Sequence, residues 1–155
     1  MGRPTRSPDH TLALAFEFMR IFQSRASQAA PSMPMYCAVG IALGPVEAYY
    51  PESGAQVYDL FGRGIILATR YEGLRDLIFP YLNTKDSIII VQKSVFEQLS
   101  PFWQEKFKRL ELDGKQLYVR DDEGADQVYY SLGAVTVSSS LTSSSERTKQ
   151  EAESA

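Results

Sequence analysis

Apolar side chains dominate the first regular stretch of the chain, residues 7–25. Ser7 is a suitable N-cap, and Pro8 suits the first helical position because its missing N–H would have no partner there. Asp9 would then lie near the positive end of the helix dipole. If residues 7–25 form a helix, apolar side chains lie on most of its circumference: Leu12, Leu14, Phe16, Phe18, Met19, Ile21 and Phe22. The pattern predicts a well-buried helix, followed by a loop over residues 26–34.

Short runs rich in β-branched and aromatic residues come next. Residues 35–50 predict two short strands with a bend near Gly44 and Pro45. A turn is expected at residues 51–54, and a third extended piece at residues 55–61.

Helical spacing returns from about Gly62 to Ile78. The core candidates of this helix are Ile65, Leu67, Leu74, Leu77 and Ile78. An uninterrupted apolar run then predicts a buried strand over residues 85–91. Residues 93–100 predict a short helix that stops before Pro101.

The last patterned stretch, residues 107–132, predicts a β-hairpin that turns at Asp113 and Gly114. A second break is expected within residues 121–126. From residue 135 the chain is rich in serine and cannot bury enough apolar surface to offset its entropy, so residues 135–155 are predicted to be a disordered tail. The alternation of helices and strands favours one α/β or α+β domain over residues 1–134.

Composition and charge narrow the class of protein. The chain has 155 residues and a net charge of −3, which argues against a general binder of nucleic acid or of anionic membranes. Cys37 is the single cysteine, so no internal disulfide can form, and we expect it to be a small buried hydrophobe in a strand. The sequence shows neither a secretory signal nor a membrane segment, and a cytoplasmic location is expected.

Other residues with possible chemistry have plain structural interpretations. His10 has no partner at metal-ligand spacing and is expected to be a helix-start residue. The acidic run of residues 121–123 resembles a cation site, but a solvated loop is the commoner case. Four aromatic residues are expected to pack in the core and at its rim: Phe96, Phe102, Trp103 and Phe107.

Particular motifs resemble a known family. The segments are "CAVGIALGPV" at residues 37–46, "YDLFGRGIILATR" at 58–70 and "LELDGKQLYV" at 110–119, with "MGRPTRSPDH" at the start. In this order they resemble the C-terminal part of the class III nucleotidyl (adenylate/guanylate) cyclase catalytic domain, over roughly residues 2–132. The resemblance implies a ferredoxin-like α+β domain, truncated at its N-terminus, with a mixed or antiparallel sheet and helices packed on it.

The resemblance also implies roles for two residues. Asp59 matches the family's residue that accepts a hydrogen bond from the adenine amino group, which implies ATP as the nucleotide. Arg70 matches the catalytic arginine that stabilises the transition-state phosphate, a task that suits a permanently charged, planar fork of donors. Taken without the resemblance, Asp59 is a turn or cap residue and Arg70 a solvated helix arginine.

Two departures from the family pattern limit this interpretation. Ile66 stands where the family has an asparagine that orients the ribose, and isoleucine can neither donate nor accept a hydrogen bond. Its apolar side chain suggests packing rather than chemistry. The family's two metal-binding aspartates and base-reading lysine lie in a half that this chain does not match. The Mg²⁺ or Mn²⁺ ions expected for the family therefore have no ligands here, and we expect the chain alone to be inactive.

Three hypotheses follow. The chain could be part of an adenylate cyclase that acts with a second cyclase domain, as a homodimer or a heterodimer. It could instead be a non-catalytic regulatory or nucleotide-binding module that docks on a cyclase partner. A third possibility is a remnant without function, since the loss of a central strand would leave an unpaired sheet edge.

Overall fold

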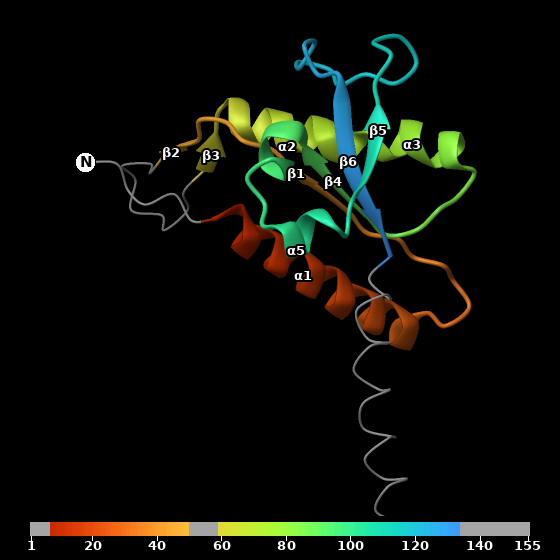
Figure 1. Ribbon diagram of the computed structural model, residues 1–155. Coiled ribbons are helices and arrows are strands. Elements are labelled where there is room, and N and C mark those ends of the chain that lie inside the picture. Colours follow the sequence, from red (N-terminus) through yellow and green to blue (C-terminus); the bar gives the residue numbers. More distant parts are fainter. Residues whose placement is uncertain (1–6, 50–58, 134–155) are drawn as a thin grey trace, which may run out of the picture.

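The computed structural model describes residues 7–49 and 59–133, drawn in colour in Figure 1. Its helices and strands are, in chain order, α1 (Pro8–Ala29), β1 (Ala38–Ile41), β2 (Glu47–Tyr49), β3 (Asp59–Phe61), α2 (Arg63–Gly73), α3 (Arg75–Leu82), β4 (Ile88–Gln92), α4 (Lys93–Phe96), α5 (Pro101–Gln104), β5 (Lys108–Glu111) and β6 (Gln127–Leu132). The predicted turn at residues 51–54 and the predicted tail at residues 135–155 lie outside the described residues.

Four strands form the main sheet, in the order β1-β4-β6-β5. β1 runs parallel to β4, whereas β6 is antiparallel to both β4 and β5. A separate antiparallel pair joins β2 to β3 and places Glu47 opposite Phe61. The prediction of an α+β domain with a mixed sheet is confirmed.

β4 is the centre of the fold because apolar residues occupy both of its faces. Ile88 and Ile90 point to one face, and Ile89 and Val91 to the other, and all four are fully buried. A strand covered on both faces reads as a continuous apolar run, which is how the sequence predicted it.

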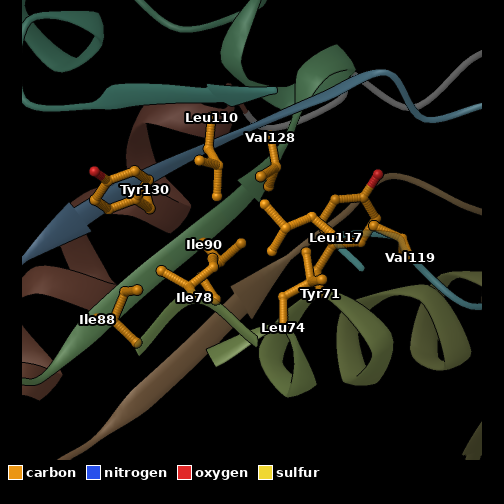
Figure 2. Packing of buried hydrophobic residues seen from close by; sticks show 10 residues of the cluster. All are labelled: Tyr71, Leu74, Ile78, Ile88, Ile90, Leu110, Leu117, Val119, Val128 and Tyr130. Carbon is orange, nitrogen blue, oxygen red and sulfur yellow. The ribbon is translucent and has the colours of Figure 1, made fainter. Parts of the chain in front are cut away.

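One face of the sheet is covered by α2 and α3 (Figure 2). The buried cluster on this face consists of Tyr71, Leu74, Ile78, Ile88, Ile90, Leu110, Leu117, Val119, Val128 and Tyr130. α1 covers the opposite face with Leu12, Ala15 and Met19, together with Val95 and Leu99. The sheet is therefore the middle layer between helices.

α1 begins as the sequence predicted. The Ser7 side chain accepts a hydrogen bond from the backbone N–H of Asp9, and Pro8 is the first helical residue. The helix continues to Ala29, one turn beyond the predicted end. The prediction that it is well buried was wrong, because Leu14 is 71% exposed and Phe18 is 56% exposed. Only the side that faces β4 is covered in the described part of the chain.

The helix predicted from Gly62 to Ile78 is in fact two helices, α2 and α3, which meet at Leu74. The backbone N–H of Leu74 donates to the carbonyl of Tyr71, three residues earlier, so the chain tightens at this point. Of the predicted core residues, Leu67, Leu74 and Ile78 are buried, while Ile65 and Leu77 are exposed.

The hairpin predicted over residues 107–132 was partly wrong. β5 pairs with β6 across a long connection, and residues 115–120 form no strand. The turn at Asp113 does exist: its carboxylate accepts hydrogen bonds from the backbone N–H groups of Lys115, Gln116 and Leu117. Leu117 and Val119, two residues apart, both point into the core. This spacing is the same as in a strand, and it explains why the sequence pattern predicted one.

The predicted aromatic group packs against the α1 face of the sheet. Trp103 stacks on Phe16 with ring centroids 5.4 Å apart, and Phe96 stacks on Tyr129. Phe102 is the exception, 63% exposed at the rim of the group. Trp103 and Phe102 belong to α5, a helix that the sequence pattern did not predict.

Cys37 lies just before β1 and packs, partly buried, against the α1 face of the sheet. Burial raises the pKa of its thiol, as does the nearby Glu72 carboxylate. It packs with apolar side chains as predicted, but it is only partly buried and lies just outside the strand in which it was expected. Among the described residues, none of the helices has the length and apolar character needed to cross a bilayer.

Candidate functional site

The site predicted from the sequence centres on α2, and glycines set the position of this helix. Gly62 is its N-cap, with a φ of 129° that favours glycine. A Cβ placed on Gly44 would lie 2.7 Å from the Cα of Gly64, so the chain after β1 touches the first turn of α2. β1 itself contacts the middle of α2 at Gly40, where the absence of a side chain leaves room for the backbone of Ala68 and Glu72. α2 is thus held directly on β1.

Arg70 projects from the accessible side of this fixed helix. Its Nε donates to Oδ2 of Asp121 at 2.7 Å, and the two side chains remain 35% and 46% exposed. Nη2 of Arg63, two turns earlier on α2, donates to the carbonyl of Asp121 at 3.3 Å. Arg70 is therefore not simply solvated, as an isolated helix arginine would be, but it stays accessible to a ligand.

Arg70 also lines a shallow surface depression of about 310 Å³. Arg120 lines the same depression from the connection between β5 and β6, along with Thr69 and Tyr118. Glu72 is the one acidic side chain in the lining. Two guanidinium groups in one depression are suited to an anion such as a phosphate.

Tyr71, the residue after Arg70, points the other way and is buried in the core. Its hydroxyl donates to Oδ2 of Asp122 at 2.6 Å, and Nε2 of Gln92 donates to the same oxygen at 3.2 Å. The other end of the Gln92 amide accepts from the backbone N–H of Leu43. Burial, and then the Asp122 carboxylate, raise the pKa of the Tyr71 hydroxyl. This network ties α2, β4 and the segment after β1 to the loop that carries Asp121.

The acidic run at residues 121–123 lies in a largely exposed loop, as expected, but two of its carboxylates accept hydrogen bonds from other elements. Asp121 faces Arg70, Asp122 accepts from neutral donors, and Glu123 is exposed. Asp121 has a φ of 66°, in the left-handed region that aspartate and asparagine tolerate better than most residues. Within residues 7–49 and 59–133, His, Cys, Asp and Glu side chains form no group of three or more that could hold a metal ion.

Ile66 lies one turn before Arg70 on the same side of α2. The apolar side chain suggested packing rather than chemistry, but at 48% exposed it is not covered within the described part of the chain. The preceding residue, Ile65, and Phe61 at the end of β3 are also exposed. The arginine of the site therefore shares its helix with uncovered apolar surface.

Asp59 is the first residue of β3, where its backbone pairs with Tyr49 of β2. β3 leads directly into Gly62 and α2, so the chain runs from Asp59 to Arg70 through one strand and one helix. Nothing is described of the Asp59 side chain, and its contact with an adenine stays a prediction. His10 is exposed in the first turn of α1.

The sequence did not point to Tyr71, Gln92 or Arg120 as part of this region. Only the folded chain brings them together: Tyr71 and Gln92 bind Asp122 across long sequence separations. Arg120 reaches the depression beside Arg70 from the connection between β5 and β6. The nearest signal was the spacing of Tyr71 from Leu67 and Leu74, which places all three on the buried side of the helix.

Comparison with known proteins adds no identification: no protein-family model matches this chain, and no curated protein matches it significantly. The likeness to class III cyclases rests on the quoted motifs and on the order of the elements that carry them.

The Tyr71 hydroxyl gives a testable pH dependence. Tyr71→Phe should lower the free energy of unfolding at pH 7 by about 1–3 kcal/mol, because the Asp122 carboxylate loses its shortest hydrogen bond. The pKa of Tyr71 is raised in the folded state, so this contribution is complete below the unfolded pKa of about 10 and is lost as pH rises further. Urea titrations should show that the difference in the free energy of unfolding between the parent and Tyr71→Phe is smaller above pH 10 than at pH 7. An equal difference at both pH values would contradict the hydrogen bond from Tyr71 to Asp122.

Asp121→Asn tests the ion pair that holds Arg70. Because both side chains are partly exposed, the change in the free energy of unfolding should be below about 1 kcal/mol. Asparagine also tolerates the left-handed backbone at this position. Asp121→Ala is the matched variant, and it should cost more because alanine lacks that tolerance. Thermal unfolding of the three proteins measures both effects, and equal losses for the two variants would contradict the backbone argument.

Proposed function

We propose that this chain is the C-terminal part of a class III adenylate cyclase domain, of the ferredoxin-like type, and that it supplies Arg70 to a site completed by a second cyclase domain. The reaction would convert ATP to cyclic AMP and diphosphate. The observation that carries the proposal is the accessible face of α2, where Arg70 follows the uncovered Ile66 by one helical turn. An arginine beside exposed apolar surface is typical of a face that another protein covers.

The role of Arg70 would be electrostatic. As the ribose 3′ oxygen attacks the α-phosphate, negative charge builds on the phosphoryl oxygens, and a fixed guanidinium meets it without reorganising. α2 can hold such a donor rigidly because Gly40 and Gly64 allow close backbone contact between this helix and the segment around β1. Arg120 could contact the diphosphate, since it lines the same depression as Arg70.

By the resemblance, Mg²⁺ or Mn²⁺ would be held by the partner's aspartates rather than by this chain. The described residues offer no group of acidic or histidine ligands that would hold such an ion. The contribution of this chain would then be limited to binding and orienting the triphosphate, with Asp59 accepting from the adenine amino group.

A second candidate is a non-catalytic module that docks on a cyclase and regulates it. The observation in its favour is that Arg70 already has a carboxylate partner, Asp121, while Ile66 cannot hold the ribose. Such a module would use the same face of α2 for docking and would leave the chemistry to its partner.

Complementation tests the proposal. The partner is a class III adenylate cyclase domain with intact metal aspartates whose own transition-state arginine is replaced by alanine, so that its homodimer is inactive. On mixing with this chain, ATP and Mg²⁺, we expect cyclic AMP to form. The chain alone and the partner alone serve as controls, and both should be silent.

The outcomes separate the two candidates. Cyclic AMP in the mixture supports a catalytic half. Binding of the two proteins without cyclic AMP, together with a changed activity of the unmodified cyclase, would contradict catalysis and favour the regulatory module. Absence of binding would overturn both.

A further inference from the structure

Two consecutive residues of α2 pair with two consecutive residues of the connection between β5 and β6. Nε of Arg70 donates to Oδ2 of Asp121 at 2.7 Å, and this pair is exposed. The Tyr71 hydroxyl donates to Oδ2 of Asp122 at 2.6 Å, and this pair is partly buried. The same two segments are thus joined twice, once at the surface and once toward the core.

The two pairs contribute unequally to the position of this connection. Arg70 and Asp121 are 35% and 46% exposed, and an exposed ion pair holds its two partners weakly. The Tyr71 ring is 1% exposed and belongs to the buried cluster that also contains Val119 (Figure 2). A hydrogen bond from a packed side chain to a charged acceptor is stronger than such an ion pair. The inner pair therefore decides where the outer pair can form.

Gln92 of β4 holds the Asp122 carboxylate from a second direction. Its Oε1 accepts from the backbone N–H of Leu43 at 2.9 Å, and its Nε2 donates to Oδ2 of Asp122 at 3.2 Å. A backbone N–H can only donate, so the amide oxygen must face Leu43 and the amide nitrogen must face Asp122. The Asp122 carboxylate is thus anchored to both α2 and β4.

The backbone around Asp122 extends this anchoring to its neighbour. The N–H of Asp122 donates to the carbonyl of Val119 at 3.2 Å, and its own carbonyl accepts from the N–H of Ala125 at 3.0 Å. Val119 is itself 2% exposed. Only Arg120 and Asp121 lie between Val119 and Asp122, so the position of Asp121 is restricted from both sides.

We propose that Asp122 is a positioning residue that acts on Arg70 through Asp121. Because the Asp122 carboxylate is anchored to α2 and β4, the neighbouring Asp121 carboxylate holds the Arg70 guanidinium in one direction. Asp121 binds Nε, which directs the terminal nitrogens of the guanidinium to a phosphate. A donor aligned before the reaction meets developing charge without reorganising. The effect on rate rests on the cyclase function proposed above, whereas the alignment of the guanidinium does not.

The side-chain Nε–H signal of Arg70, in an N–H correlation NMR spectrum of the full chain, reports this alignment. Arg70→Lys identifies the signal, because that variant lacks it. Asp122→Ala should move the signal to the position of a solvated arginine. Gln92→Met should do the same, since methionine has a similar length but no amide. Asp122→Asn should leave the signal in place, because its amide oxygen still accepts from both donors.

Ile89→Val is the matched control for a loss of stability alone. Ile89 is fully buried on the face of the sheet that α1 covers, so this variant loses packing without touching the network. Its Arg70 signal should stay in place. An unmoved signal in Gln92→Met and in every folded Asp122→Ala sample would overturn the proposal. The same displacement in Ile89→Val would also overturn it.

The complementation mixture supplies a second reading. Asp122→Ala should lower the rate at saturating ATP about tenfold or more, because a misplacement of about 1 Å can cost about 10²-fold. The KM for ATP should not change, since the interaction is made only in the transition state. An altered KM with an unaltered rate at saturation would overturn the positioning role. A parent mixture that forms no cyclic AMP would contradict the proposed function, and the NMR comparison would still decide whether Asp122 aligns Arg70.

Discussion

Replacing Arg70 by alanine should lower the rate of cyclic AMP formation about 10²–10³-fold in the complementation mixture. That is the typical cost of removing one fixed donor from a transition state in which charge develops. Binding between the two proteins should change little, because the pair of Arg70 with Asp121 is partly exposed and holds no element in place by itself. Rates measured at saturating ATP, beside a binding titration, separate these two effects.

The matched control is Arg75→Ala, which removes an arginine from the next helix. Arg75 pairs with Glu72 and Asp76 and does not line the depression that contains Arg70. Its loss should leave the rate within about twofold. Arg70→Lys should recover only part of the rate, because an ammonium group keeps the charge but not the planar fork of donors. Equal rates for Arg70→Ala and Arg75→Ala would rule out a catalytic role for Arg70.

Gly40→Val should destabilise the fold by about 3 kcal/mol, at the upper end of what overpacking usually costs. The new side chain would meet backbone atoms of α2, including the Cα of Glu72 at 2.9 Å from its Cβ. Backbone atoms of a packed helix cannot rotate away as a flexible side chain can, so β1 and α2 would have to separate. Valine favours strands, so propensity alone predicts the opposite result.

Gly73→Ala provides the control for this substitution. A Cβ at Gly73 has no atom within 4 Å, and alanine forms helix better than glycine by about 1 kcal/mol. This variant should be as stable as the parent or slightly more stable in a urea titration. A Gly40→Val protein as stable as Gly73→Ala would show that α2 does not lie directly on β1.

The sequence predicted those parts of the fold that depend on local chemistry. The cap at Ser7 and the buried run of β4 were visible because each is a property of neighbouring residues. The two short strands around Gly44 were visible for the same reason. The break between α2 and α3 was not, since Leu74 keeps the helical spacing and only its hydrogen bond to Tyr71 shortens the turn.

The candidate site was predictable to a smaller extent. Motif spacing placed Arg70 on a helix that follows β3, and the structure has it there. Its partner Asp121 could not be inferred, because the connection between β5 and β6 brings the two together across the molecule. The exposure of Ile66 and Leu14 was also hidden, since apolar periodicity identifies a side chain that favours burial but not whether anything covers it.

The exposed faces of α1 and α2 have one feature in common. Both carry uncovered apolar residues, Leu14 on α1 and Ile66 on α2, one turn before Arg70. Exposed apolar surface of this kind is typical of faces that another protein covers.

The most direct test of this account is the rate of cyclic AMP formation as the chain is titrated into the arginine-deficient cyclase partner at fixed ATP and Mg²⁺. We predict a rate that is negligible without the chain, rises with its concentration and saturates, and that the Arg70→Ala chain suppresses by competing for the partner. A rate that stays at the background level at every concentration, although the two proteins bind, would contradict the claim that this chain supplies the catalytic arginine.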